Sequence, residues 1–366
     1  MNEDAIPVPS RGEQIDATIE KVIFGGDGLA RIQDRFVVFV PFTAEGDRVR
    51  VRITERKAHH ARAEVVEILN QGPMRETPPC PYYARCGGCQ YQHLTYAEER
   101  RLKENQVREA FSRVGKMPDA HVLPIIAGPN PYGYRNRITV HAEAGRIGFR
   151  GVNGRDLIDI RACALARPAV NDELTRLRQG QPADGHYSLR DSTVPPSGFF
   201  QANHELRETL RELIASALPE RGETLLEGYC GGGFFTEIVA GRFQRVVAVD
   251  DDSRTLRDAH RLGLNNVEWR HADVAIVLPD ELRSLAGKDT AVLLDPPREG
   301  LPVRLTEALC LDPVPHLTYV SCDPATLARD TRMLSRQYEL ISVQPIDLFP
   351  RTAQIECVSV WKRRSL

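Results

Sequence analysis

The order of apolar and polar positions changes period along the chain. Between residues 12 and 70, apolar and polar positions alternate at the two-residue period of β-strands, and glycine-rich turns separate the runs. The alternation is clearest at 14–20 and 48–53, and 36–42 is a continuous apolar run. This pattern predicts a small β-barrel.

The rest of the chain divides into two further parts. Residues 94–114 combine dense charge with apolar residues at helical spacing, which predicts an amphipathic helix, and 132–195 return to strand periodicity with a hairpin at 135–150. From about Ser197 onward, strands and helices alternate as in a doubly wound parallel sheet, so the predicted fold class is α/β. The predicted domains are 1–71, 72–196 and 197–366.

Composition narrows the class of protein. The length of 366 residues, with 42% hydrophobic and 27% charged residues, fits a globular protein with more than one core. No apolar stretch approaches the roughly 18 residues of a membrane span, and the acidic start of the chain lacks the features of a signal peptide. We therefore expect a cytoplasmic protein without membrane contact.

A net charge of -2 does not exclude a nucleic-acid partner, because the sum over a chain hides local basic stripes. Arg48, Arg50 and Arg52 would share one face of a strand and could contact phosphates. Four arginines of the central hairpin are further candidates: Arg135, Arg137, Arg146 and Arg150. A solvated strand face is the alternative in both places.

Three of the eight cysteines fall within ten residues, at Cys80, Cys86 and Cys89, and a Gly-Gly turn lets the last two sulfurs converge. Zinc and iron-sulfur sites need a fourth ligand, for which Cys163 is the best candidate. The spacing leaves both kinds of site open, with unligated thiols as the third interpretation. The five-residue gap after Cys80 does not match the three-residue gap of radical enzymes that cleave S-adenosylmethionine, so any cluster is predicted to be structural.

The C-terminal part carries a pattern typical of an adenosine-containing ligand. A strand at 224–229 leads into a glycine-rich turn around Gly231, and the next strand ends at Asp250, which could accept hydrogen bonds from ribose hydroxyls. Asp273 follows a third strand and could contact adenine or cap a helix. The turn lacks the spacing of dinucleotide-binding loops, which favours S-adenosylmethionine over NAD.

Two later strands end in Asp295 and Cys322. In open parallel sheets the ligand lies at the carboxyl ends of the strands, so Cys322 is placed where a nucleophile would act. An inert buried cysteine is the alternative at this position. It is the preferred interpretation for the remaining three cysteines, Cys230, Cys310 and Cys357.

Together these motifs resemble the RNA uracil-5-methyltransferase family over almost the entire chain. The N-terminal part resembles the TRAM domain, an OB-like RNA-binding barrel. The other matching motifs are Cys80-x5-Cys86-Gly-Gly-Cys89 with Cys163, Gly-Phe-Phe-Gln-Ala-Asn at 198–203, Tyr-Cys-Gly at 229–231, Asp-Pro-Pro-Arg at 295–298, Val-Ser-Cys at 320–322 and Phe-Pro-Arg-Thr-Ala-Gln-Ile-Glu at 349–356.

The resemblance implies a role for each matching residue. Cys322 would add to C6 of uracil, and Glu356 would remove the C5 proton after methyl transfer. The target uridine would have to be unstacked into the pocket. The four cysteines would hold a structural four-iron four-sulfur cluster in the central domain. S-adenosylmethionine would be held by Gln201, Tyr229, Gly231, Asp250, Asp273 and Asp295.

The barrel and the cluster together resemble the enzymes of this family that methylate 23S ribosomal RNA, and monomers are usual in the family. A transfer-RNA enzyme is the alternative substrate branch. A cytosine methyltransferase is a further alternative, although Ser321 stands before Cys322 where those enzymes have proline or paired cysteines. Phe234 replaces an asparagine that commonly contacts the cofactor, which leaves a non-catalytic RNA-binding relative as a third possibility.

Overall fold

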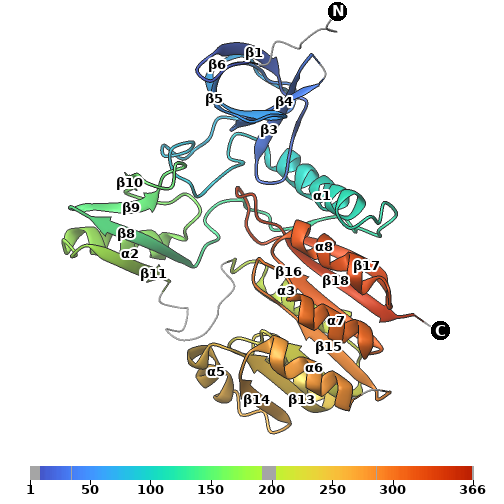
Figure 1. Cartoon of the computed structure of the whole chain (residues 1–366). Coiled ribbons are helices and arrows are strands. Elements are labelled where there is room, and N and C mark those ends of the chain that lie inside the picture. The colour runs from blue at the N-terminus through green and yellow to red at the C-terminus, as the bar shows by residue number, and fades with distance from the viewer. Residues whose placement is uncertain (1–8, 34, 192–202, 286, 365–366) are drawn as a thin grey trace, which may run out of the picture. The chain divides into compact units, whose positions relative to one another are not determined.

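The computed structural model describes residues 9–33, 35–191, 203–285 and 287–364. Contacts within the chain define two compact units, and each is described by itself (Figure 1). Unit 1 comprises Met1–Lys103, Asn130–Arg190 and Phe349–Ala353, and unit 2 comprises Glu104–Pro129, Asp191–Leu348 and Gln354–Leu366. The predicted α/β class is confirmed, whereas the bounds of the three predicted domains stay a prediction.

The first sheet of unit 1 follows the order β1-β5-β6-β4-β3-β2, and Figure 1 shows its strands curled around a common interior. The alternation of apolar and polar residues gives each strand an inner and an outer face. In β5, Val49, Val51 and Ile53 are buried in the interior, while the arginines between them point outward. The predicted barrel is therefore present. Its strands are β1 (Gln14–Thr18), β2 (Lys21–Val22), β3 (Asp27–Ile32), β4 (Phe36–Pro41), β5 (Arg48–Arg56) and β6 (His60–Asn70).

The outward arginines of β5 share one face, as predicted, but acidic residues of the neighbouring strands accompany them. Arg50 Nε donates to Asp16 Oδ1 of β1 at 2.9 Å, and Arg52 Nη1 donates to Glu64 Oε1 of β6 at 3.2 Å. All four side chains remain partly exposed. The expected basic stripe is thus a row of alternating charges rather than a purely positive surface.

The second sheet of unit 1 follows the order β10-β9-β8-β11. Helix α2 (Pro168–Gln179) begins with a proline at its first turn and packs Val170 and Leu174 against the buried residues of the sheet. The predicted hairpin is present as β8 and β9, joined by a turn at Gly145. The strands are β8 (Arg137–Glu143), β9 (Arg146–Arg150), β10 (Leu157–Asp159) and β11 (Gly185–Arg190).

The sheet of unit 2 follows the order β14-β13-β12-β15-β16-β18-β17-β7. β12 to β16 pair in parallel, and β18 is antiparallel to both of its neighbours. Both faces are covered, which is why β15 is a continuous buried run. The strands are β7 (Ile126–Ala127), β12 (Gly222–Gly228), β13 (Phe243–Asp250), β14 (Val267–His271), β15 (Thr290–Leu294), β16 (His316–Ser321), β17 (Tyr338–Asp347) and β18 (Glu356–Arg363).

Helices accompany the strands of unit 2 and supply its core. Within the described residues, every helix is too short or too polar to cross a membrane. The boundary between the units falls inside α1, after Lys103. The helices are α1 (Tyr96–Arg113), α3 (Arg207–Ala217), α4 (Thr236–Val239), η1 (Ala240–Arg242), α5 (Ser253–His260), α6 (Val274–Ser284), α7 (Val303–Leu311) and α8 (Pro324–Leu334).

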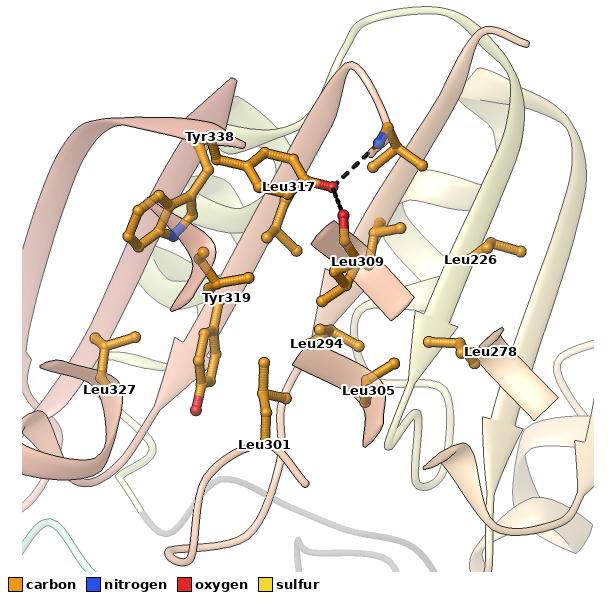
Figure 2. Close-up of a cluster of buried hydrophobic side chains, with 14 of the residues drawn as sticks. Leu226, Leu278, Leu294, Leu301, Leu305, Leu309, Leu317, Tyr319, Leu327 and Tyr338 are labelled. Atoms are coloured by element: carbon orange, nitrogen blue, oxygen red, sulfur yellow. Dashed lines mark hydrogen bonds between the residues drawn. The ribbon is translucent and has the colours of Figure 1, made fainter. Parts of the chain in front are cut away.

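The main core of unit 2 lies between α6, α7 and α8 and the strands beneath them (Figure 2). Leucines from helices and strands interdigitate there, and the buried Tyr338 hydroxyl is fully used. It accepts from Val314 N at 3.1 Å and donates to the Leu309 carbonyl at 3.2 Å. This core fixes the strands whose ends carry the candidate site.

Leu309→Ala is expected to destabilise unit 2, because Leu309 is 0% exposed and truncation leaves a cavity. The expected loss is about 2 to 5 kcal/mol in the free energy of unfolding, measured by urea denaturation. Leu311→Ala is the matched control on the same helix, since Leu311 is 78% exposed and its loss should cost less than about 0.5 kcal/mol. Equal effects of both variants would contradict this packing.

Candidate active site and cysteine site

Polar residues gather at one edge of the unit 2 sheet. Because β12 to β16 run parallel, their carboxyl ends lie on the same side, and the reversal of strand order between β12 and β15 makes that edge a ligand crevice. β18 runs the other way, so its first residue, Glu356, lies at this edge too. The residues that end or follow the five parallel strands are Tyr229, Asp250, Asp273, Asp295 and Cys322.

Strand register brings the predicted nucleophile and base together. β16 and β18 are antiparallel neighbours, and Ser321 pairs with Cys357. β16 ends at Ser321, so Cys322 is the residue directly after it, and Glu356 is the first residue of β18. Continuing the register by one residue brings these two side chains within contact range. The charge of Glu356 accordingly acts on the Cys322 thiol.

Two carboxyl groups at this edge, one buried and one partly buried, favour their protonated forms. Glu356 is 6% exposed, and its burial, together with negative charge on Asp295, raises its pKa well above the usual value. Burial raises the pKa of Asp295 to about 7. At neutral pH this edge can therefore hold protons that exposed carboxyl groups would have released.

The Cys322 thiol is protonated at neutral pH in the protein without ligand. Burial raises its pKa to about 11, and the negative charges of Glu356 and Asp295 act in the same direction. Arg298 opposes this shift through its positive charge. Since only the thiolate is a strong nucleophile, added positive charge or protonation of the nearby carboxyl groups would activate Cys322.

The glycine-rich turn after β12 has a conformation that its sequence requires. Gly231 and Gly233 have φ of 52° and 80°, and Tyr229 also lies in the left-handed region at 64°. A Cβ on Gly233 would come within 2.7 Å of Leu262. Gly231 N donates to Asp250 Oδ2 at 2.8 Å, which ties the turn to the end of β13. Glycine is therefore required in this turn, both for its backbone conformation and for close packing at Gly233.

Glu227, on β12 just before this turn, was missed at the level of sequence. Its Oε2 accepts from Thr236 Oγ1 at 2.6 Å, while Oε1 is buried and has no hydrogen-bond partner among the described residues. Burial raises its pKa to about 8, and the charges of Asp295 and Asp250 contribute. The signal was a lone acid within the apolar run of β12, since an acid is rarely buried without a function or a partner.

The remaining predicted ligand-binding residues have different outcomes. The Asp273 side chain accepts from Ala275 N at 2.8 Å and caps α6, so the cap foreseen as the alternative to an adenine contact is present. Gln201 lies outside the described residues, and of the 198–203 motif only Asn203 is described.

Phe234, the departure from the family pattern, packs beside helix α3. The guanidinium groups of Arg207 and Arg211 each lie 5.4 Å from the centre of its ring, and the tilted ring of Phe235 lies 5.0 Å away, centre to centre. These cation–π contacts stabilise the aromatic ring in this position. Two arginines of the neighbouring helix therefore accommodate the phenylalanine that replaces asparagine.

The four clustered cysteines lie together in unit 1. The thiols influence one another electrostatically, and Cys163 interacts in this way with each of the three thiols of the Cys80 to Cys89 loop. Burial raises the pKa of Cys89 to about 12, and the pKa values of Cys86 and Cys163 also rise. Protein donors point at three of the sulfurs, since Gly88 N donates to Cys86, the Gln92 side chain donates to Cys89, and the backbone after Cys163 donates to that thiol.

The described residues hold no preformed metal-ion site. Among them, no group of three or more histidine, cysteine or acidic side chains is placed to hold a metal ion. The zinc and iron-sulfur interpretations of the cysteine spacing therefore both stay predictions. Of the remaining cysteines, Cys230 and Cys357 are buried.

Two known protein families match parts of this chain. Residues 10–66 match the TRAM domain, and residues 281–364 match the family described as tRNA (Uracil-5-)-methyltransferase. A protein from Bdellovibrio bacteriovorus described as an uncharacterized RNA methyltransferase is 30% identical over 98% of this chain and 97% of its own length. Another from Thermosynechococcus vestitus is 29% identical, with 96% and 98% covered.

A solved structure shares the fold. The crystal structure of Pyrococcus abyssi tRNA (uracil-54, C5)-methyltransferase in complex with S-adenosyl-L-homocysteine covers 94% of this chain and 99% of its own, with a TM-score of 0.74 and 22% identity. The full-length relatives define the class, an RNA methyltransferase. Within that class, the chain belongs to the RNA uracil-5-methyltransferase family, as its motifs predicted.

Alkylation of Cys322 by iodoacetamide should follow its raised pKa. The rate is expected to rise about tenfold per pH unit, up to a pH of about 11. Arg298→Ala should slow it a few-fold at about pH 9, because loss of the cation raises the pKa of the thiol further. Peptide mass spectrometry resolves the modified cysteine. Arg304→Ala, an exposed change on α7, is the matched control, and equal slowing by both variants would contradict the role of Arg298.

Proposed function

We propose that the protein forms 5-methyluridine in 23S ribosomal RNA, with Cys322 as the nucleophile and Glu356 as the general base. The observation that carries this proposal is the antiparallel pairing, at the ligand edge of the sheet, of β16, which Cys322 follows, with β18, which begins at Glu356. A thiol opposite a buried carboxyl group is the pair of groups that methylation of uracil C5 needs, because one must activate the ring and the other must take a proton from it.

The reaction begins at Cys322. Its thiolate adds to C6 of the uracil, and the resulting enolate makes C5 a nucleophile that attacks the methyl group of S-adenosylmethionine. The Glu356 carboxylate then takes the C5 proton, the bond between sulfur and C6 breaks, and the double bond of the ring returns. The products are 5-methyluridine and S-adenosylhomocysteine, and the proton passes from Glu356 to solvent.

The charge of the methyl donor suits this acidic edge. S-adenosylmethionine carries a sulfonium and an ammonium group, and Asp250, Asp295 and Glu227 lie at or beside the glycine-rich turn. We infer that Asp250 accepts from the ribose, since a carboxylate bonded to two protein amides retains lone pairs for further donors. Tyr229, Gly231, Asp273, Asp295 and Gln201 complete the proposed binding set.

The choice of 23S ribosomal RNA follows from the modules of unit 1. The TRAM barrel supports an RNA substrate, and its combination with four clustered cysteines favours the ribosomal branch of the family. Transfer RNA is the second candidate, because the solved neighbour is by its description a transfer-RNA enzyme. We propose that the protein acts on either RNA as a monomer.

We infer that Cys80, Cys86, Cys89 and Cys163 hold a four-iron four-sulfur cluster. Burial and donors to the sulfurs, which support this inference, are the features that stabilise such clusters. When bound, the cluster would cross-link the loop that carries three of these cysteines to the segment that carries Cys163. No step of the reaction passes through it.

Nucleoside mass spectrometry tests the proposed reaction. Unmodified 23S ribosomal RNA and transfer RNA transcripts are incubated with anaerobically purified protein and S-adenosylmethionine, and 5-methyluridine is expected in the ribosomal transcript. Cys322→Ala should abolish the product because no adduct can form. Glu356→Gln should slow product release on the order of 10²- to 10⁴-fold and leave a methylated RNA–protein adduct on denaturing gels.

Two changes away from the site serve as controls for these variants, Cys310→Ala at a partly buried position of α7 and Glu339→Gln at an exposed position of β17, and both should retain activity. Product in transfer RNA alone would move the substrate to that branch, and 5-methylcytidine would identify a cytosine enzyme. Full methylation by Cys322→Ala would overturn the proposed nucleophile. Absence of product, with intact RNA binding but no S-adenosylmethionine binding in calorimetry, would favour the non-catalytic relative.

Elemental analysis tests the proposed cluster. Anaerobically purified protein is expected to contain iron and acid-labile sulfide in equal amounts. Cys163→Ser should lower both, since a cluster needs its fourth ligand, whereas Cys310→Ser in unit 2 should leave both unchanged. Zinc without sulfide, or iron unaffected by Cys163→Ser, would contradict the assignment.

A further inference from the structure

Five residues from the C-terminal part of the chain, Phe349–Ala353, belong to unit 1, and we call them the strap. Pro350, Arg351 and Thr352 of the strap are buried. Two residues, Gln354 and Ile355, join the strap to Glu356 at the start of β18. The strap is thus the segment of unit 1 that precedes the proposed general base along the chain.

Side chains of unit 1 form hydrogen bonds with the backbone of the strap at successive residues. The Phe349 carbonyl accepts from Lys103 Nζ at 3.1 Å, and the Pro350 carbonyl accepts from the Tyr134 hydroxyl at 3.0 Å. Arg351 N donates to Glu99 Oε1 at 2.7 Å. Lys103, Tyr134 and Glu99 are themselves buried, so these bonds are shielded from water.

Gln90, the residue directly after Cys89, supplies two more of these bonds. Its backbone N–H donates to the Arg351 carbonyl at 2.9 Å, and its side-chain Oε1 accepts from Ala353 N at 3.1 Å. Its Nε2 donates to the Gly87 carbonyl at 3.1 Å, within the loop that carries the clustered cysteines. Gln90 therefore connects the cysteine loop to the end of the strap.

The Arg351 side chain anchors the middle of the strap. Its guanidinium donates to the Leu94 carbonyl at 2.6 Å and to Glu76 at 3.0 Å, and it lies 4.8 Å from the centre of the Tyr132 ring. The backbone of Arg351 has φ of 66°, a costly conformation for a residue with a side chain. Such strain persists only where surrounding contacts over-determine it, and it is typical of functional segments.

We propose that Gln90 and Arg351 are positioning residues for Glu356, and that the task of the cysteine site is to keep Gln90 in place. This inference rests on the proposed function. Addition of Cys322 and methyl transfer precede the work of Glu356, so neither needs the strap. A loosened strap should therefore slow removal of the C5 proton, and with it release of the product from Cys322, more than it slows methyl transfer.

The test separates these two steps in a single turnover. The RNA carries tritium at uracil C5 and the methyl donor carries a labelled methyl group, so tritium released to water reports proton removal. In Gln90→Ala, methyl transfer should stay within about twofold of wild type, while tritium release should slow on the order of tenfold or more and methylated adduct should accumulate. The same partition is expected for Arg351→Lys and for the Cys163→Ser protein.

Two variants control for general damage. Gln90→Glu retains the acceptor for Ala353 N but loses the donor to Gly87, and it should release tritium close to the wild-type rate. Gln179→Ala, an exposed change at the end of α2, should be silent. Thermal unfolding and iron content of each variant show whether unit 1 stays intact.

Equal slowing of both labels by an intact Gln90→Ala protein, or no slowing of either, would overturn the positioning role. Failure of the proposed function is distinct from this result. In that case wild-type protein forms no adduct and releases no tritium, whatever residue stands at position 90.

Discussion

Burial of ionisable groups at the ligand edge of the unit 2 sheet is the constraint on which the rest of the site depends. The edge gathers Cys322, Asp295, Glu356 and Glu227, and withdrawal from water is the largest cause of the raised pKa of each group. Negative charge on neighbouring groups adds to this effect at Cys322, Glu356 and Glu227. The protonated carboxyl groups and the protonated thiol follow from this burial. A cationic methyl donor is the natural partner of such an edge, because its charge favours the ionised form of every group around it.

The burial of these groups also affects the order of the steps in the proposed reaction. The Cys322 thiol must lose its proton before it can attack, and that becomes easier once positive charge lies nearby. Glu356 must be ionised after methyl transfer, when the sulfonium charge has been consumed. A carboxyl group whose pKa is raised by burial is a stronger base than an exposed one, so the burial that makes Glu356 costly to ionise also makes it effective at removing a proton from carbon.

The sequence predicted the parts of this structure that depend on local pattern. Continuous apolar runs predicted the parallel strands of unit 2. Because Cys322 follows one of these runs, the sequence also predicted that Cys322 lies at the ligand edge of the sheet. The charge pairing on the barrel was not predictable in this way, because Arg50 meets Asp16 from a strand 34 residues away. The contacts of the strap were not predictable either, because Arg351 and its partner Glu99 lie 252 residues apart in the sequence.

The alternating charges on the barrel also change the argument about RNA. An arginine paired with a neighbouring acid must give up that partner to bind a phosphate, so β5 gains less from counterion release than an unpaired basic strand would. Phosphate contacts carry no sequence information in any case. In the proposed reaction, selectivity for one uridine would therefore come from the shape of the RNA and from the fit of an unstacked base against Cys322 and Glu356, where a ring that cannot form the enolate would not react.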